Sequence, residues 1–188
     1  VSSLYEDTLG RVWITTLSGI NRFESTSKSF VRCEFKSRSG LTYDMSESWA
    51  FLLDSQEKYW IGSGLSLISV NQQTNLVEAV FPLGVLRMVE DKEGNCLWIG
   101  SQSNGLVKLN KGTHQLTKFI NDPNDPSTIS QNRVYTLCVD YADPEHVLWA
   151  GTGNGLNRFD KATGKFRRFT EKDGLPSNLI FSIAFDKR

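Results

Sequence analysis

The chain of 188 residues contains only three cysteines and two histidines. Cys33, Cys96 and Cys138 are odd in number and lack the spacing of a metal site, so we expect free thiols buried as small hydrophobic side chains. His114 and His146 stand on polar segments with no nucleophile beside them, and we expect both to be exposed loop residues. The sequence therefore predicts neither a cofactor nor a metal centre.

An excess of charge of one sign is also missing, because 21 Lys and Arg residues balance 21 Asp and Glu residues. A nucleic-acid-binding surface needs basic groups in excess to neutralise phosphates, so nucleic acid is not an expected partner. The longest apolar run, residues 65–70, contains serines and is far shorter than the roughly 18–20 residues of a membrane helix. We expect any membrane attachment to lie outside this sequence. Because Val1 replaces an initiator Met and no signal-peptide pattern follows, we interpret the sequence as a processed chain or an excised piece.

An internal repeat is the main feature that the sequence does contain. With 39% hydrophobic and 11% aromatic residues, the chain has enough apolar side chains for a real core. An acidic residue ends a short apolar run about every 45 residues, which is the period of one four-stranded propeller blade. These acidic positions are Asp7, Asp54, Asp91, Asp140 and Asp186. We interpret them as turn formers that bind local backbone, in preference to acid or base catalysts.

A tryptophan follows in a second short run of four of the repeats. The four residues are Trp13, Trp60, Trp98 and Trp149. Small or hydroxylated residues come next, such as Gly100 and Ser101, and they permit close approach of a neighbouring backbone. Four-stranded sheets cannot bury both faces alone, so we expect the tryptophans to fill the space between stacked blades.

The remaining segments complete an all-β repeat. A glycine turn in three copies leads to a third run, and a polar hairpin such as residues 160–164 leads to a fourth. Apolar positions alternate over five or six residues, and helical spacing is absent. The predicted fold is a β-propeller segment of about four four-stranded antiparallel blades plus the first strand of a fifth. The expected blades are residues 1–47, 48–84, 85–132 and 133–178, with residues 179–188 opening the next blade.

This order of motifs resembles the two-component regulator propeller repeat. The resemblance rests on Asp-x-x-Gly turns, Trp-Ile-Gly strands, the Gly-Leu-Asn-Arg-Phe-Asp strand at residues 155–160, and the connections at residues 121–132 and 171–178. It covers essentially the whole chain, although the second copy lacks both turn glycines.

The resemblance implies a piece of the periplasmic sensor region of a bacterial hybrid two-component histidine kinase, on the outer side of the inner membrane. Such propellers are commonly seven-bladed, so four blades would form an open arc. The remaining blades of the same protein, or a second copy in a homodimer, are then expected partners. A small closed ring of four blades is the alternative that we favour less.

Ligand-binding residues are expected on long connections and at the starts of first strands, since loops on a rigid scaffold carry function. Residues 34–47 and 121–132 are the long connections on one face of the propeller. Aromatic side chains next to arginine can hold a sugar by stacking and hydrogen bonding. The predicted ligand-binding residues are Tyr43, Trp49, Arg87, Arg133 and Tyr135.

Three functions remain open from the sequence. The first is a non-catalytic sensor module that binds a carbohydrate or another small molecule and signals to a membrane histidine kinase. The second is a structural or dimerisation segment, with the ligand bound elsewhere. The third, a propeller lyase or hydrolase, is disfavoured because no acid and base residues cluster in the sequence.

Overall fold

The computed structural model describes residues 1–7, 10–91 and 93–184. The chain divides into two compact units, Val1–Val85 and Leu86–Arg188, and each is described here by itself. Each unit contains two four-stranded antiparallel sheets whose strands follow one another in chain order. The predicted all-β fold of four antiparallel four-stranded blades is therefore confirmed.

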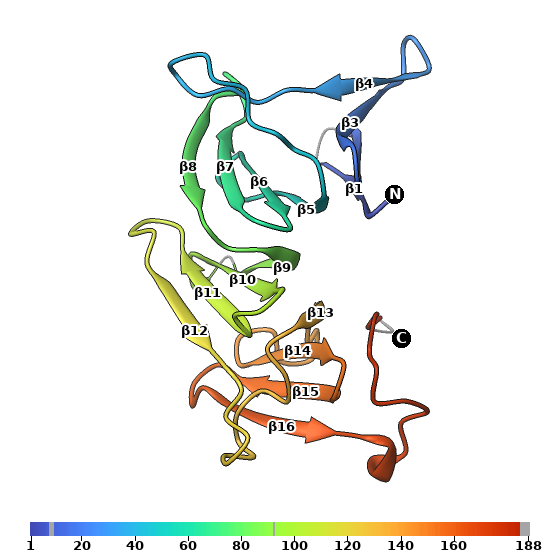
Figure 1. Cartoon of the computed structure of the whole chain (residues 1–188), viewed down its shortest axis with the longest axis vertical. Helices are drawn as coiled ribbons and strands as arrows, with labels where there is room; N and C mark the ends of the chain where they lie inside the picture. Colours follow the sequence, from blue (N-terminus) through green and yellow to red (C-terminus); the bar gives the residue numbers. More distant parts are fainter. Residues whose placement is uncertain (8–9, 92, 185–188) are drawn as a thin grey trace. The chain divides into compact units, whose positions relative to one another are not determined.

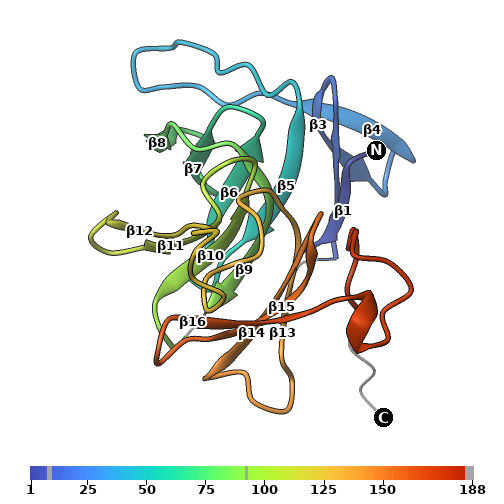
Figure 2. The same cartoon turned by 60° about the horizontal axis from the view of Figure 1, so that its bottom comes forward.

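The first unit contains the first two sheets, drawn in blue to green in Figure 1. The strands of these sheets are β1 (Ser3–Glu6), β2 (Val12–Thr16), β3 (Gly19–Glu24), β4 (Ser29–Cys33), β5 (Ser48–Leu53), β6 (Lys58–Ser63), β7 (Leu67–Asn71) and β8 (Val77–Phe81). The long connection from β4 to β5 reaches past β8 before it returns to β5 (Figure 2). It is held there by a hydrogen bond of 2.8 Å from the Val77 amide to the Lys36 carbonyl.

The second unit repeats the same arrangement. Its elements are β9 (Val85–Asp91), β10 (Cys96–Ser101), β11 (Leu106–Asn110), β12 (Leu116–Phe119), β13 (Val134–Val139), β14 (Val147–Thr152), β15 (Gly155–Asp160), β16 (Lys165–Phe169) and the short 3-10 helix η1 (Glu171–Asp173). Among the described residues, no helix has the length and apolar character needed to cross a membrane.

The expected first strand of a fifth blade is not formed by residues 179–184, and Asp186 lies outside the described residues. Every first strand in the structure pairs with the second strand of its own sheet. The fifth blade and the larger ring therefore stay predictions.

A hydrogen bond between tryptophan and aspartate recurs in all four sheets. In each sheet the indole Nε1 donates to the carboxylate that ends the first strand, at 2.9 Å for Trp13 to Asp7, 2.8 Å for Trp60 to Asp54, 3.2 Å for Trp98 to Asp91 and 2.9 Å for Trp149 to Asp140. The same carboxylates accept backbone N–H groups of the following turn, as when Asp54 accepts from Lys58 at 2.9 Å. These aspartates thus form the expected turns and, in addition, accept the hydrogen bond of the indole N–H group.

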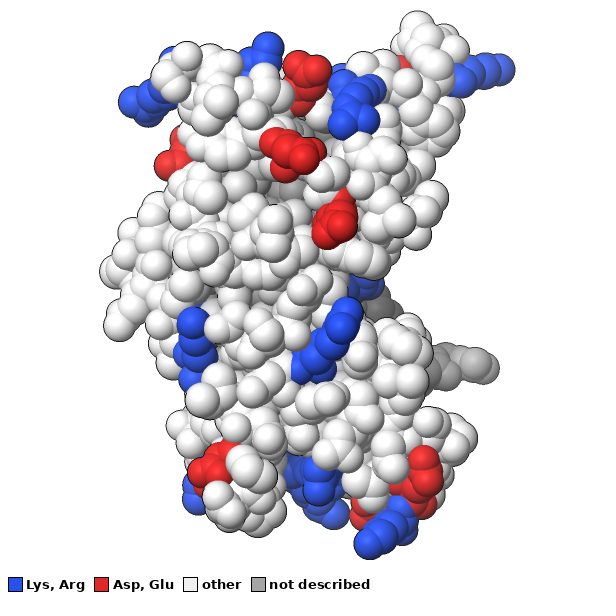
Figure 3. Space-filling model, in the orientation of Figure 1, with Lys and Arg blue, Asp and Glu red and all other residues white. Residues whose placement is uncertain are grey.

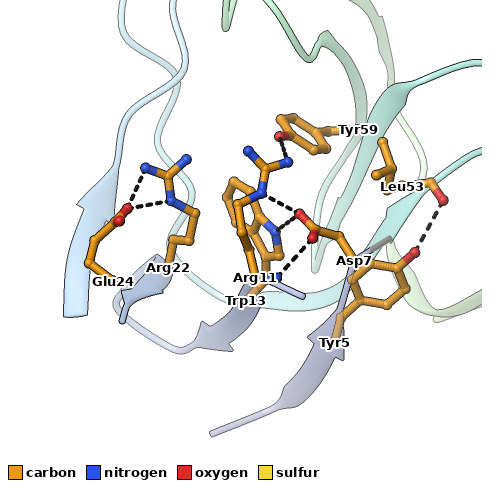
Figure 4. Close-up of polar contacts among 8 residues, drawn as sticks. All are labelled: Tyr5, Asp7, Arg11, Trp13, Arg22, Glu24, Leu53 and Tyr59. Atoms are coloured by element: carbon orange, nitrogen blue, oxygen red, sulfur yellow. Dashed lines mark hydrogen bonds and ion pairs between the residues drawn. The ribbon is translucent and has the colours of Figure 1, made fainter. Parts of the chain in front are cut away.

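The tryptophans of the first sheet in each unit pack against the second sheet, as expected. Trp13 stacks on Phe51 with ring centroids 4.6 Å apart. Arg11 binds Asp7 and donates to the Tyr59 hydroxyl at 3.2 Å, which ties the two sheets of the first unit together (Figure 4). In the second unit Trp98 meets Phe159 edge to face at 5.2 Å.

Glycines after the tryptophans allow the next sheet to approach. A Cβ built on Gly100 would lie 2.9 Å from the Val134 carbonyl oxygen. We expect Gly100→Ala to destabilise the chain by about 1–3 kcal/mol, because rigid backbone must move. Gly112→Ala is the matched control, since its Cβ would meet nothing nearer than 3.5 Å. Urea unfolding of both variants measures the difference, and equal unfolding free energies would contradict this account of Gly100.

The pH dependence of stability should report on Asp91. Burial raises the pKa of Asp91, but hydrogen bonds from Lys161, the Gly94 amide and Trp98 outweigh it, so the pKa lies below its ordinary value of 3.8. Ionised Asp91 therefore stabilises the folded chain above pH 3.8, and this contribution is lost as the pH falls through the lower folded-state pKa. We expect urea unfolding at a series of pH values to show this loss, with a smaller loss in Asp91→Asn. Identical pH profiles for the two proteins would contradict the assignment.

Candidate functional site

The long connection at residues 121–132 forms the wall of a polar pocket in the second unit. The pocket has a volume of about 280 Å³ and is lined by Asn121, Asp122, Pro123, Asp125, Pro126, Thr128, Ser130, Asn154 and Arg168. Asn154 comes from the turn between β14 and β15, and Arg168 comes from β16. Three separate segments therefore converge on one open pocket.

Buried Asn157 fixes this connection to the sheet. Its carboxamide oxygen accepts the Ser130 amide at 2.9 Å, and its Nδ2 lies 2.9 Å from the Ser130 hydroxyl. The Ser130 hydroxyl also lies 2.8 Å from the Thr152 hydroxyl. A buried network whose members are all hydrogen-bonded holds a segment in one geometry. Asn157 therefore holds the connection in a fixed position on the sheet.

Residues within the connection also form hydrogen bonds with one another. The Asn121 side chain donates to the Ile129 carbonyl at 2.7 Å, and the Asn121 amide donates to the Asn132 side chain at 2.7 Å. The Asp122 amide donates to the Thr128 hydroxyl at 3.0 Å. These bonds join the two ends of the loop and hold the pocket wall in one shape.

Arg168 supplies the positive charge of the pocket. It is exposed, and its guanidinium makes no hydrogen bond or ion pair with any residue that the structure describes. The carboxylates of Asp122 and Asp125 line the same pocket. Donors and acceptors side by side suit a ligand with many hydroxyl groups, because each hydroxyl can both donate and accept.

Two of the predicted site residues lie together directly after this connection. The Arg133 guanidinium carbon lies 5.3 Å from the centre of the Tyr135 ring, and Tyr135 packs on Phe181 with ring centroids 4.9 Å apart. Arg133 and Phe181 are exposed and Tyr135 is half-buried. Phe181 was not among the predicted site residues. Its position five residues before Asp186, where Tyr135 stands before Asp140, is the signal that could have identified it.

The other predicted site residues do not join this group. Arg87 is exposed on β9 and has no hydrogen bond, ion pair or ring contact with Arg133 or Tyr135 in the described part of the chain. Tyr43 and Trp49 belong to the first unit, where both are half-buried. Whether these three bind a ligand stays a prediction.

Tyr43 lines a second pocket, of about 260 Å³, formed by the other long connection. The lining residues are Arg32, Cys33, Glu34, Thr42, Tyr43, Asp44 and Met45. Trp49 lies at an irregularity of β5, and its buried indole nitrogen has no hydrogen-bond partner among the residues that the structure describes. Both connections that were expected to carry function thus border a pocket in their own unit.

The cysteines and histidines differ in burial and in the direction of their pKa shifts. Burial raises the pKa of Cys96 to about 11, so its thiol is unreactive at neutral pH. Cys33 and Cys138 are free but only half-buried, which corrects the expectation of three buried thiols. Exposed His146 lies 2.7 Å from Asp143, and this hydrogen bond raises its pKa. No group of three His, Cys, Asp or Glu side chains among the described residues is arranged to hold a metal ion.

Charged side chains of both signs are interspersed on the face drawn in Figure 3. This pattern agrees with the balanced composition of the chain. Among the described residues, this face therefore presents no broad field of one sign that could steer a charged ligand.

Comparisons with known proteins support the fold and the resemblance drawn from the repeats. No protein-family model matches the sequence. The chain is 31% identical over 152 residues to histidine kinase P4 of Formosa agariphila, an alignment that covers 72% of this chain and 11% of the kinase. The chain thus spans about a tenth of that relative.

Two solved structures share the fold. The extracellular domain of BT4673 from B. thetaiotaomicron, described as a hybrid two-component system, is 20% identical with a TM-score of 0.72, covering 90% of this chain and 24% of that one. PorZ of Porphyromonas gingivalis, a surface component of the type-IX secretion system, is 19% identical with a TM-score of 0.69, covering 87% of this chain and 26% of that one. The predicted resemblance to the sensor regions of hybrid two-component systems is confirmed at the level of the fold.

Proposed function

We propose that this chain is a non-catalytic, extracytoplasmic sensor module that binds a carbohydrate-type ligand and signals to a membrane histidine kinase. The observation that carries the proposal is the pre-organised polar pocket beside residues 121–132, whose lining includes Arg168, Asp122 and Asp125. The similarity to a histidine kinase and to an extracellular domain of a two-component system supports the sensor class.

A carbohydrate fits the chemistry of the second unit for two reasons. The pocket offers guanidinium and carboxamide donors next to carboxylate acceptors, which matches neighbouring sugar hydroxyls. The segment that forms the pocket continues into Arg133 and Tyr135, and the exposed ring of Phe181 packs on Tyr135. Aromatic rings supply the apolar surface on which the C–H face of a sugar can stack.

Signalling sets a further requirement on the ligand. A ligand shifts an equilibrium between two arrangements only if it binds one of them more tightly. In the proposed protein the ligand would favour one arrangement of propellers or subunits, in a homodimer on the periplasmic side of the inner membrane. The kinase and the membrane segment would belong to parts beyond this sequence.

A structural role is the second candidate. PorZ, which shares the fold, is a surface component of a secretion system, so this fold is not confined to sensors. In that case the propeller segment would mediate assembly, and the ligand would be bound elsewhere.

Calorimetric titration of the chain with a panel of oligosaccharides tests the proposal. We expect one glycan class to bind, and Arg168→Ala to weaken binding about tenfold or more. Arg133→Ala and Tyr135→Ala test the adjoining group in the same way. Lys165→Ala is the control, because Lys165 is exposed on the same strand as Arg168 and does not line the pocket.

The results of this titration distinguish the sensor function from the structural role. Binding that all three variants leave unchanged would place the ligand elsewhere in the chain and overturn the proposed site. Absence of binding to every glycan would favour the structural role. Turnover of a bound glycan would contradict the non-catalytic assignment.

A further inference from the structure

Arg168 lies on the face of the β13–β16 sheet that the 121–132 connection covers. It stands directly opposite Asn157 across β15 and β16, so the two side chains point to the same face. On that face Asn157 accepts the Ser130 amide of the connection at 2.9 Å. The opposite face, which carries Trp149, is the one on which a following blade would stack. The connection and the sheet itself therefore form the surroundings of Arg168.

The aliphatic stem of Arg168 lies against the start of β15. A Cβ built on Gly155 would lie 3.2 Å from Cγ and 3.4 Å from Cδ of Arg168. Gly155 has a φ of +112°, a conformation that glycine adopts readily and other residues do not. The glycine thus leaves the space that the arginine stem occupies, next to Asn154, and both Asn154 and Arg168 line the pocket.

The equivalent cation of the preceding sheet already has a partner. Lys118 stands one residue before the end of β12, as Arg168 does in β16, and the strand registers agree. The Lys118 ammonium donates to the Asn104 side-chain oxygen at 3.0 Å. Arg168 makes no hydrogen bond or ion pair with any described residue, and the equivalent Asn154 side chain donates to the Ser130 carbonyl at 3.3 Å. The sheet that borders the pocket therefore leaves its cation available.

The two carboxylates of the pocket, in contrast, accept hydrogen bonds from their own loop. An Asp122 oxygen accepts a backbone amide of its turn at 2.9 Å, and an Asp125 oxygen accepts the amide and the hydroxyl of Ser127 at 2.8 Å and 2.7 Å. The Ser127 bonds, together with the positive charge of Lys165, hold the pKa of Asp125 below its ordinary value of 3.8. These carboxylates shape the loop, whereas the donors of Arg168 are unused within the described chain.

We propose that the ligand of this pocket is an acidic carbohydrate, and that Arg168 binds its carboxylate or sulfate group. The inference rests on the proposed function and names the class of sugar that the same pocket takes. A guanidinium presents paired N–H donors that match two oxygens of an oxyanion, and such charged hydrogen bonds are stronger than neutral ones. The remaining carboxylate oxygens of Asp122 and Asp125 can accept hydroxyl groups of the same ligand.

Isothermal titration calorimetry of the chain with matched pairs of oligosaccharides tests the inference. One kind of pair is a uronic-acid oligosaccharide and its carboxyl-reduced form, and the other is a sulfated oligosaccharide and its desulfated form. Within one kind of pair, we expect the acidic member to bind about tenfold or more tightly than the neutral member. The pair that shows this preference identifies the oxyanion as a carboxylate or a sulfate.

Variants of Arg168 test its role in this preference. Arg168→Gln should remove the preference, so that the acidic and neutral members bind alike. Arg168→Lys should keep part of it, because lysine retains the charge but loses the paired donors. Lys118→Gln is the matched control and should keep all of it, since it removes the same charge from the equivalent position of β12 and Lys118 does not line the pocket. Both residues are exposed, so each variant should fold, which circular dichroism checks.

Failure of the inference and failure of the proposed function give different results. Equal affinity of the wild-type chain for both members of every pair would overturn the inference and leave the proposed carbohydrate binding standing. Absence of binding to every oligosaccharide would overturn both. A preference for acidic sugars that survives in Arg168→Gln would also overturn the inference, because another group would then bind the oxyanion.

Discussion

Replacing Asp54 by alanine is expected to lower the free energy of unfolding by about 2–4 kcal/mol. The Asp54 carboxylate is only 4% exposed. One of its oxygens accepts the Trp60 indole at 2.8 Å, and the other accepts the amides of Gln56 and Lys58 at 2.9 Å each. The alanine variant removes all three acceptor contacts at once. The indole nitrogen of Trp60, a residue that is 0% exposed in the wild-type chain, then loses its acceptor.

Urea unfolding followed by tryptophan fluorescence measures this loss. Asp44→Ala is the matched control, because Asp44 also accepts an amide and a hydroxyl, both from Ser46, but is exposed. We expect the control to lose much less stability than Asp54→Ala, since water replaces the lost acceptor. Equal losses in the two variants would mean that the indole bond adds nothing to stability.

The recurring tryptophan and aspartate were visible in the sequence, but the bond between them was not. Asp7 precedes Trp13 by a short turn, whereas the Asp143-Pro144 insertion separates Asp140 from Trp149 by a longer one. The bond is the same in both sheets because Trp13 lies opposite Tyr5 and Trp149 lies opposite Cys138, each two residues before the aspartate, so the strand register sets the distance whatever the length of the turn. A sequence pattern based on fixed spacing cannot reveal such a contact.

The candidate site could be predicted only in part, for a related reason. Arg133 and Tyr135 are close in the sequence, on either side of the first residue of β13, so the combination of an aromatic side chain with a nearby arginine was visible without the fold. Arg168 reaches the 121–132 connection only because β16 lies beside β15 and Asn157 ties that connection to the sheet. Asn157 belongs to the Gly-Leu-Asn-Arg-Phe motif that is visible in the sequence, but its hydrogen-bond partner Ser130 lies in the preceding connection. Contacts between distant segments depend on the tertiary fold, which local spacing does not encode.

Replacing Lys111 by methionine is expected to destabilise the second unit by about 3–5 kcal/mol. The Lys111 ammonium lies 2.6 Å from a Glu90 carboxylate oxygen, and the two side chains are 2% and 9% exposed. Methionine keeps most of the apolar length of lysine and removes the charge. The nearly buried Glu90 carboxylate then loses the Lys111 ammonium, and the loss of this ion pair is the source of the cost.

Two further variants separate the effect of the lost charge on stability from the effect of the changed side-chain packing. Lys58→Met breaks the Lys58–Glu78 ion pair, whose side chains are 30% and 32% exposed, and should cost no more than about 1 kcal/mol because water screens the remaining carboxylate. The double variant Lys111→Met with Glu90→Leu should recover most of the loss, since it removes both charges. Guanidinium chloride unfolding of the four proteins, wild type included, measures these differences. A double variant as unstable as Lys111→Met would show that the lysine acts through its packing, and that the buried ion pair is not what holds β9 to the turn after β11.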